Sequence, residues 1–407
     1  MKTGRPSTWK FRVSSFSALK RVKLRRPIVL SANSDWNIAN FRVGLIRGLR
    51  DAGYEPVVIA PQDPAAESRM RELDIERIAV TVDRSGLNPI ADLALLRRYR
   101  SILRALSPAA YLGYTIKPNI YGSLAAASLG VPALPNVSGL GTAFIRGGPL
   151  QRLVTELYRA GFRRAPVVFF QNDEDRRLFV DRRIVRADQA RVLPGSGVDL
   201  QRFAPTPQPG GRPVFLLIAR LLRDKGVVEF IEAARSLRSK AIDARFQLLG
   251  PIDKDNRTAI SSAELASWVG DGTIEYLGTT DDVRPFIASA TAVVLPSYRE
   301  GLPRSLLEAA AMSRPLVATD VPGCREVVDD GVTGLLCEVR NAHSLSAKLA
   351  QILEMSEGAR REMGLRGRDK VVAEFDEARV VEHYRQTLFA LTGSDKFAAA
   401  KGQGTEQ

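Results

Sequence analysis

Short apolar runs alternate with amphipathic stretches along most of this chain. The runs at residues 27–32 and 55–60 predict buried parallel strands, and the stretch between them, with Phe41 and Leu49 at helical spacing, predicts a helix. Residues 33–37 read as the loop between the first strand and that helix. A strand, a helix and a strand in this order form a β-α-β unit, which we expect to be right-handed with a parallel sheet.

The same pattern continues through the rest of the chain, with one interruption. Residues 203–213 hold four prolines and two glycines, a composition that marks a linker between domains. The remaining strands before the linker are predicted at 110–113, 132–137, 165–170 and 190–193, and the helices at 92–106 and 119–129. After the linker, strands are predicted at 214–218, 245–249, 273–277, 292–295, 315–318 and 335–337, and helices at 227–237, 344–353 and 378–391.

The two halves predict an α/β protein of two doubly wound, Rossmann-like domains that face a cleft. Ligands of such sheets bind outside the carboxyl ends of the strands. The last amphipathic helix is expected to pack back on the first domain. The predicted divisions are a basic arm at 1–26, a first domain at 27–204, a linker at 205–213, a second domain at 214–375, the returning helix at 376–392 and a disordered tail at 393–407.

The chain is strongly basic, with 59 Lys and Arg against 45 Asp and Glu and a net charge of +14. Residues 1–26 contain nine Lys or Arg and no acid. Such an arm is either a solvated leader or a binder of anionic lipid, and the sequence leaves both interpretations open. Nucleic acid is not an expected partner, because basic and aromatic residues do not interleave as they do in nucleic-acid-binding modules.

The residues that commonly form disulfides and metal sites are scarce. Two cysteines, Cys324 and Cys337, are too few for a disulfide scaffold and suit a reducing cytoplasm. Two histidines, His343 and His383, exclude a histidine-rich metal site. No apolar run reaches the length of a membrane span, and the first residues lack the apolar core of a signal peptide.

The most informative stretch is residues 296–308, which read P-S-Y-R-E-G-L-P-R-S-L-L-E. A predicted strand precedes this stretch and an apolar helix follows, with Pro303 expected at the first helical position. The free N–H groups and the dipole of such a turn can bind an anion. Glu300 lies in the turn and Glu308 on the helix, roughly 12 Å further if helical rise applies throughout. A sugar-diphosphate-ribose fits this arrangement, although an ordinary capped helix has the same spacing.

A pair of cations is predicted at the same edge of the second sheet. Arg220 and Lys225 follow the first strand of that domain, on a loop that enters a helix. Arg can contact phosphate through two N–H groups, and Lys acts as a point charge. Together with the turn at Gly301 they would hold a diphosphate, whereas either cation alone would be read as a solvated side chain.

These residues resemble the retaining glycosyltransferases of family 4, which have the GT-B fold. Six matching segments occur in the second half in the family's order. They are I-A-R-L-L-R-D-K-G at 218–226, L-L-G at 248–250, Y-L-G at 276–278, L-P-S-Y-R-E-G-L-P-R-S-L-L-E-A at 295–309, A-T-D-V-P-G-C-R-E-V-V at 318–328 and G-V-T-G-L-L at 331–336. The first half matches through N-I-A-N-F-R at 37–42, I-K-P-N at 116–119, S-G-L-G-T-A-F at 138–144, F-F-Q-N-D-E-D at 169–175 and P-G-S-G-V-D at 194–199.

The resemblance implies an activity and its partners. The family branch builds bacterial O-antigen, capsule, exopolysaccharide and lipid-linked oligosaccharides. By resemblance, the chain moves a hexose or N-acetylhexosamine from a UDP-sugar to an undecaprenyl-diphosphate-linked saccharide. It would act as a peripheral protein on the inner face of the bacterial inner membrane, and the UDP-sugar is a substrate, so no cofactor is expected.

The resemblance also assigns roles to residues. Glu308 would hold the ribose hydroxyls and Glu300 the donor sugar, while Arg220 and Lys225 stabilise the charge on the leaving UDP. No metal is expected, because the cations and the helix end replace it and no Asp-x-Asp motif occurs in a plausible donor loop. The predicted catalytic residues are Glu300, Arg220 and Lys225, and the donor-binding set adds Gly250, Leu277, Gly301, Leu302, Pro303 and Glu308.

The first domain departs from the family's pattern. Many relatives carry a histidine beside the reaction centre, but the first half of this chain has none, and Ile116 stands where we would look for it. The paired glycines of the family's first loop are also absent. The residues expected on the acceptor side are Asp35, Asn37, Lys117, Asn119 and Thr142.

The helix that follows Pro149 is both basic and amphipathic. Such a helix is a candidate for docking on a membrane surface, as a lipid-linked acceptor would require, but it could equally pack on its own sheet with solvated arginines. The docking candidates are Arg152, Arg159, Arg163 and Arg164.

Two other functions stay open on the sequence. A nucleotide-sugar 2-epimerase would share the fold without needing an external acceptor, although the combination of two cations and two carboxylates favours transfer. A basic nucleic-acid-binding protein is suggested by the net charge alone. Thermal stabilisation by UDP that is lost in Arg220→Ala would support the transferase. Tight DNA binding without UDP binding would support the nucleic-acid-binding protein.

Overall fold

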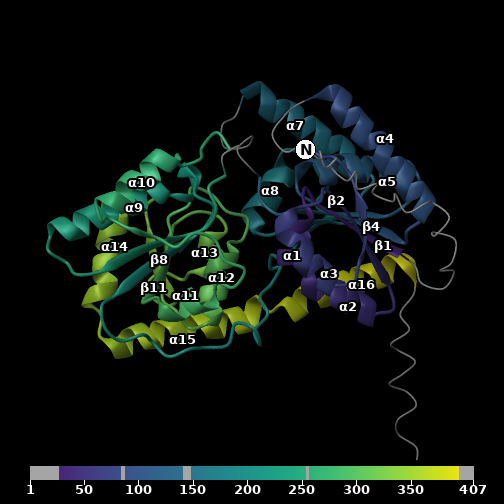
Figure 1. The fold of residues 1–407 in the computed structure, drawn as a ribbon. Coiled ribbons are helices and arrows are strands. Elements are labelled where there is room, and N and C mark those ends of the chain that lie inside the picture. The colour runs from purple at the N-terminus through teal and green to yellow at the C-terminus, as the bar shows by residue number, and fades with distance from the viewer. Residues whose placement is uncertain (1–26, 84–87, 141–147, 254–255, 394–407) are drawn as a thin grey trace, which may run out of the picture.

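The computed structural model describes residues 27–83, 88–140, 148–253 and 256–393. These residues form two α/β domains, each built on one sheet of parallel strands with helices on both faces (Figure 1). The predicted fold class, two doubly wound domains, is confirmed.

The amino-terminal sheet has seven strands in the order β3-β2-β1-β4-β5-β6-β7. The strands are β1 (Pro27–Ser31), β2 (Glu55–Ala60), β3 (Glu76–Ala79), β4 (Ala110–Tyr114), β5 (Ala133–Val137), β6 (Val168–Phe170) and β7 (Ala190–Val192). One face is covered by α4 (Pro89–Leu106), the π-helical turn η3 (Pro118–Gly122), α5 (Ser123–Ala127), α7 (Gly148–Phe162) and α8 (Asp173–Asp181). On the other side lie α1 (Asp35–Phe41), α2 (Val43–Asp51), the short turn η2 (Pro64–Ala66) and α3 (Glu67–Glu72).

The second sheet has six strands in the order β10-β9-β8-β11-β12-β13. They are β8 (Val214–Ile218), β9 (Arg245–Leu249), β10 (Glu275–Tyr276), β11 (Ala292–Leu295), β12 (Leu316–Thr319) and β13 (Gly334–Cys337). The helices are η4 (Arg223–Lys225, a 3-10 turn), α9 (Val227–Ser239), α10 (Ser262–Gly270), α11 (Arg284–Ser289), α12 (Arg304–Ala311), α13 (Cys324–Val327), α14 (Ala342–Glu354) and α15 (Glu357–Glu374). Because β8 and β11 are neighbours, the loops that follow them meet at the carboxyl edge of the sheet.

The last helix, α16 (Glu377–Thr392), leaves the second domain and packs against α2 of the first (Figure 1). Its residues Val380, Tyr384 and Leu388 are buried in the core between the amino-terminal sheet and α2. The Tyr384 hydroxyl accepts a 3.0 Å hydrogen bond from the side-chain amide of Asn136, in β5. The chain's last described helix is therefore part of the first domain's core.

The proline-rich linker is held on the second domain by Arg314. This side chain is fully buried, and burial lowers its pKa to about 10. Its guanidinium donates to the carbonyl oxygens of Ile287 (3.0 Å) and Ala288 (3.1 Å) at the end of α11, and to Pro207 and Thr206 of the linker. Arg314 thus donates hydrogen bonds to carbonyl oxygens at the end of α11 and also holds the linker against the second domain.

Some of the predicted elements differ from those in the structure. The predicted loop at 33–37 is wrong, since α1 begins at Asp35 and the Ser34 hydroxyl caps it by accepting from the Asn37 N–H (3.3 Å). The single helix expected after it is two helices, because Arg42 between them has a non-helical φ of −131°. The helix predicted at 119–129 is the π-helical turn η3 followed by the short α5.

Candidate functional site

An ion pair lies where the loops after β8 and β11 meet. The Lys225 ammonium, at the end of η4, contacts the Glu300 carboxylate in the turn after β11. The two side chains are 22% and 12% exposed, so the pair is largely shielded but reachable from solvent. The predicted cation and the predicted carboxylate therefore share one site.

The two loops approach each other because residue 226 is a glycine. Gly226 has a left-handed φ of 72°, and a Cβ atom there would overlap the carbonyl oxygen of Pro296. The contact continues through Asp224, whose carbonyl oxygen accepts from the Tyr298 N–H (2.9 Å) and the Ser297 hydroxyl (3.1 Å). This packing places Lys225 beside the turn that carries Glu300.

The turn ends in the amino terminus of α12. Pro303 is the residue before the helix, with an extended ψ of 112°, and its carbonyl oxygen accepts from the Leu306 (3.2 Å) and Leu307 (3.3 Å) N–H groups. The prediction that Pro303 would be the first helical residue is wrong by one position, because α12 begins at Arg304. Within the described part of the chain, the N–H groups of Gly301, Leu302, Arg304 and Ser305 have no hydrogen-bond acceptor. These donors are available to an anion.

The second predicted carboxylate, Glu308, is paired on its own helix. It accepts from the Nε of Arg304 at 2.7 Å, one turn earlier, and both side chains are mostly buried. Arg304 also reaches the first domain, where it lies over the ring of Phe41 (5.5 Å) and near the Ser196 hydroxyl (3.4 Å). Arg304 was missed in the sequence, although its position four residues before Glu308 is the spacing of a helical ion pair.

The other donor-side residues occupy separate positions. Arg220 is half exposed and pairs with Asp253 at 2.7 Å, so the two predicted cations each have their own carboxylate. The Gly250 N–H donates to the Gly278 carbonyl oxygen (2.8 Å). The Leu277 N–H donates to the Leu248 carbonyl oxygen (2.9 Å), which extends the pairing of β9 and β10.

The donor-side turn is also fastened to the first domain. The guanidinium of Arg299 pairs with the buried carboxylate of Asp175, in α8. The side-chain amide of Asn172, the N-cap of α8, donates to the Gly301 carbonyl oxygen at 2.9 Å. A Cβ atom on Gly301 would overlap the Ser138 carbonyl oxygen. We call Arg299, Gly301, Asn172 and Asp175 the interdomain clamp.

Burial and the neighbouring Arg299 have opposite effects on the pKa of Asp175. Burial raises this pKa, although the hydrogen bond and charge of Arg299 act in the opposite direction. The paired guanidinium favours the carboxylate, which is the form that holds Arg299. The clamp was missed in the sequence, where F-F-Q-N-D-E-D was noted only as a matching segment.

The acceptor-side candidates at the end of β1 differ in their hydrogen bonding. Asp35 is buried, accepts from the Asp63 N–H (2.8 Å) and lies 3.4 Å from the guanidinium of Arg77. Burial raises its pKa. The side-chain oxygen of Asn37 is buried and has no hydrogen-bond donor in the described residues. Of the two, Asn37 has unused capacity to bind a ligand.

The candidates that follow β4 are engaged within the first domain. Lys117 pairs with Asp92 of α4 at 2.7 Å, and Asn119 is buried and donates to the Asn136 carbonyl oxygen at 2.8 Å. Thr142 lies outside the described residues. Thr115 has a left-handed φ of 66°, which is strained for a β-branched residue, and its hydroxyl accepts from the Asn33 N–H (3.1 Å). Lys117 and Asn119 are therefore held by partners within the first domain, while the buried side-chain oxygen of Asn119 has no donor in the described residues.

The predicted membrane-docking arginines are not equivalent. Arg152, Arg163 and Arg164 of the α7 region are exposed. Arg159 instead pairs with Glu156 and donates to the carbonyl oxygens of Arg182 and Arg183 (both 3.0 Å) at the end of α8. Among the described residues, no helix combines the length and the apolar character that crossing a membrane would require. The described residues also hold no cluster of His, Cys, Asp and Glu that could bind a metal ion.

Comparison with known families identifies both halves of the chain. Residues 38–195 match the family model described as "Glycosyl transferase 4-like domain", and residues 212–355 match "Glycosyl transferases group 1". A Campylobacter jejuni protein, N,N'-diacetylbacillosaminyl-diphospho-undecaprenol alpha-1,3-N-acetylgalactosaminyltransferase, is 31% identical over 336 residues, which are 78% of this chain and 87% of that protein. The lipopolysaccharide core biosynthesis glycosyltransferase LpsE of Rhizobium meliloti is 29% identical over 44% of this chain and 51% of its own length.

A solved structure agrees with the fold. Anabaena Alr3699/HepE in complex with UDP-glucose superposes with a TM-score of 0.75 at 18% identity, and the match covers 90% of this chain and all of that one. At this identity the likeness establishes the arrangement of the two domains. The similar chain's ligand is a nucleotide-sugar.

Proposed function

Because this chain belongs to the group 1 glycosyltransferases and has a glycosyl transferase 4-like first domain, we propose that it uses a UDP-sugar as its donor. The sugar transferred is a hexose or an N-acetylhexosamine, and the acceptor is an undecaprenyl-diphosphate-linked saccharide of a bacterial surface polysaccharide. The relatives named above are transferases, one of them acting on a diphospho-undecaprenol saccharide, which favours transfer over 2-epimerisation.

The observation that carries the proposal is the Lys225–Glu300 pair beside the free N–H groups of the α12 turn. A diphosphate bound at the turn would meet the N–H groups of Gly301 and Leu302 and the ammonium of Lys225. Arg220, half exposed on the neighbouring loop, would leave Asp253 and contact the same charge. Together these groups would form one positively charged surface that neutralises the charge of a bound anion.

Binding of the donor would exchange partners in these ion pairs. As the diphosphate takes Lys225, the Glu300 carboxylate becomes free to accept hydrogen bonds from the donor-sugar hydroxyls. Glu308, held in place by Arg304, would accept from the ribose hydroxyls. Each carboxylate holds its cation near the site before the ligand arrives, so binding would require an exchange of partners and no assembly of charges from solvent.

The reaction we propose retains the anomeric configuration and uses no metal. The bond between the anomeric carbon and the diphosphate oxygen breaks, and its electron pair leaves with UDP. The acceptor hydroxyl oxygen bonds to the anomeric carbon on the same face, and its proton passes to the departing diphosphate. Lys225, Arg220 and the turn stabilise the charge that grows on the diphosphate, and such electrostatic stabilisation is usually the largest contribution to catalysis.

The acceptor would approach from the first domain, whose carboxyl edge meets the donor turn at Ser138 and Gly139. A lipid-linked acceptor requires the protein to work at a membrane surface. We propose peripheral binding on the cytoplasmic face of the inner membrane, and the exposed Arg152, Arg163 and Arg164 remain candidates for that contact.

The proposal is tested by measuring UDP release with a panel of UDP-hexoses and UDP-N-acetylhexosamines, each with an undecaprenyl-diphosphate-linked sugar. We expect release with one donor class, dependent on the acceptor, and an α-linked product by NMR. Release that is independent of acceptor, or interconversion of the donor at carbon 2, would contradict it. EDTA should leave the rate unchanged.

A further inference from the structure

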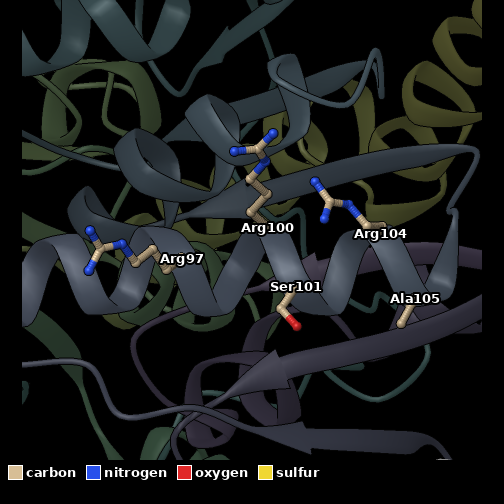
Figure 2. A pocket seen from close by; sticks show the side chains of 5 residues that line it. All are labelled: Arg97, Arg100, Ser101, Arg104 and Ala105. Atoms are coloured by element: carbon tan, nitrogen blue, oxygen red, sulfur yellow. The ribbon is translucent and has the colours of Figure 1, made fainter.

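Helix α4 carries an exposed row of cations that the donor and acceptor sites do not use. Arg97, Arg100 and Arg104 extend from successive turns and, with Ser101 and Ala105, line a shallow hollow on its outer face (Figure 2). No ion pair of these three arginines occurs within the described residues. The one carboxylate of the helix, Asp92, faces inward and pairs with Lys117.

The first turns of the same helix expose apolar side chains. Ile90 is 82% exposed and Leu93 45% exposed, on the face that the arginines continue at helical spacing. The opposite face of α4 is buried through Leu95, Tyr99 and Ile102, so this orientation of the helix is fixed by the core. The outer face thus divides into an apolar end and a cationic end.

The apolar end of α4 lies at the carboxyl edge of the amino-terminal sheet, which is the edge that faces the proposed donor site. All strands of the amino-terminal sheet are parallel, so each crossover helix begins at the carboxyl edge of the sheet. Helix α7 obeys the same rule, and its first turns expose Leu150 and Leu153. Both helices pack on η3 and α5, on the side of the domain opposite α2 and α16 (Figure 1). Two helices therefore present apolar turns at the edge where the acceptor would enter.

We infer that the outer face of α4 is the surface that docks on an anionic phospholipid bilayer. Ile90 and Leu93 would enter the interface, while Arg97, Arg100 and Arg104 contact lipid phosphates. Charge complementarity favours this partner, since the row holds cations alone and each one near an anionic leaflet adds attraction. The inference rests on the proposed function in one respect, because it explains how a lipid-linked acceptor reaches the cleft.

This surface differs from the one that the sequence indicated. There the docking contact was expected on α7, but Arg159 is engaged with Glu156 and with the end of α8. The α4 arginines have no such partner in the described chain. Helix α7 would then contribute its apolar first turns and the exposed Arg152, while Arg159 would take no part.

The first test is co-sedimentation of the full chain with vesicles that contain one third phosphatidylglycerol. We expect the triple variant Arg97→Glu, Arg100→Glu, Arg104→Glu to bind about a hundredfold more weakly than the unmodified chain. A matched variant, Lys240→Glu, Arg361→Glu, Arg379→Glu, changes the net charge equally at exposed positions away from α4 and should lose far less. Equal losses in the two variants would overturn the inference, since net charge alone would then explain binding.

The second test locates the contact independently of the basic residues 1–26. A fluorophore that responds to polarity, attached to Leu93→Cys, should shift to shorter wavelength on adding vesicles, and the same label on Arg361→Cys should not. The chain's own cysteines, Cys324 and Cys337, are buried. No shift at Leu93→Cys, or a shift at both positions, would refute docking through α4. Binding of duplex DNA that is tighter than binding of vesicles and is abolished by the α4 variant would refute the lipid assignment.

The two proposals fail in different ways. With a short-chain acceptor dispersed without a bilayer, the α4 variant should release UDP at the unmodified rate, while its rate on vesicle-borne acceptor falls. If the unmodified chain releases no UDP with any donor, the proposed function fails, whereas the vesicle and fluorophore results still decide the docking surface.

Discussion

Arg299 and Asp175 join the turn that carries Glu300 to the amino terminus of α8 in the other domain. Asp175 is fully buried, and the adjacent Asn172 donates to the Gly301 carbonyl oxygen. The backbone that would hold the donor diphosphate is therefore fastened by the acceptor-side domain. The proposed donor site is therefore positioned by contacts with the first domain.

Loosening that contact should impair catalysis more than donor binding. We expect Arg299→Ala to lower kcat with the UDP-sugar by about a hundredfold, because small displacements of reacting groups are costly, while the Kd for UDP changes little. Arg299→Lys should recover part of the rate. Arg325→Ala is the control, since Arg325 reaches the neighbouring Glu174 at 3.5 Å on the surface. If Arg325→Ala lost as much activity as Arg299→Ala, the clamp would have no special role.

The raised pKa of Asp175 predicts a pH dependence of stability. Below its ordinary value of 3.8 the carboxyl is protonated in both the folded and the unfolded chain. Above that value the folded chain keeps the proton to higher pH, so the free energy of unfolding falls with rising pH until the folded pKa is passed. In urea unfolding from pH 4 to 7, the unmodified chain should lose more stability than Asp175→Asn, because the other carboxyls of raised pKa, such as Asp35 and Glu377, contribute equally to both chains. An unmodified chain that gains stability relative to the variant across that range would mean that the pKa is lowered instead.

The ion pair of the donor site gives a prediction for catalysis. Lys225→Ala removes the cation closest to Glu300, and we expect kcat to fall by roughly 10² to 10³, the usual cost of losing one transition-state contact of this kind. Arg223→Ala is the matched control on the same short turn, because Arg223 pairs with Glu264 instead. Steady-state kinetics of UDP release would decide, and equal losses in both variants would argue for a structural role of the turn.

The ribose assignment of Glu308 predicts a loss of nucleotide affinity. Glu308→Gln should weaken UDP binding by about tenfold, the value of a charge-assisted hydrogen bond or two. The unmodified chain should bind 2′-deoxy-UDP less tightly than UDP, and the variant should discriminate less between them. Calorimetric titration measures both. Glu362→Gln, which alters a similar helical pair with Arg366 on α15, should leave UDP binding unchanged.

The buried cation of the linker predicts a loss of stability without a direct effect on chemistry. Arg314→Leu leaves the carbonyl oxygens of Ala288 and Pro207 without this donor, while that of Ile287 keeps the Ala290 N–H. We expect the free energy of unfolding to fall by about 3 kcal/mol or more, the cost of orphaned buried polar groups. Urea denaturation measures the change. A neutral or stabilising effect would show that desolvation of the guanidinium outweighs its hydrogen bonds.

The strands were predicted well where the sheet is buried on both faces. The strands at Glu55–Ala60, Arg245–Leu249 and Ala292–Leu295 match the predicted residues, because a central parallel strand requires a continuous apolar run. The edge strand Glu76–Ala79 was missed, since its E-R-I-A sequence has no such run. Helix α15 was missed because its eighteen residues are polar on nearly every side. Its register is set by contacts with α12 that sequence does not reveal.

The residues of the candidate site were likewise predicted only in part. Lys225 and Glu300 were placed in one site from the sequence, because both follow predicted strands and were expected at the same edge of the second sheet. Asp253 and Asp175 were not predicted as the partners of Arg220 and Arg299, because neither carboxylate was assigned to the predicted site. The acceptor-side candidates were chosen because they lie in or near segments that resemble the family, and not from an expected position in the sheet. The structure accordingly gives Lys117 and Asn119 partners within their own domain.

The position of α16 affects the order in which the two domains can fold during synthesis. A ribosome delivers the amino-terminal sheet first, yet Val380, Tyr384 and Leu388 complete the core beneath that sheet. Part of that apolar core in the earlier-made domain therefore stays uncovered until the whole of the later domain has been synthesised. Cutting the chain before Glu377 would yield a second domain with its sheet and helices complete and a first domain prone to aggregate.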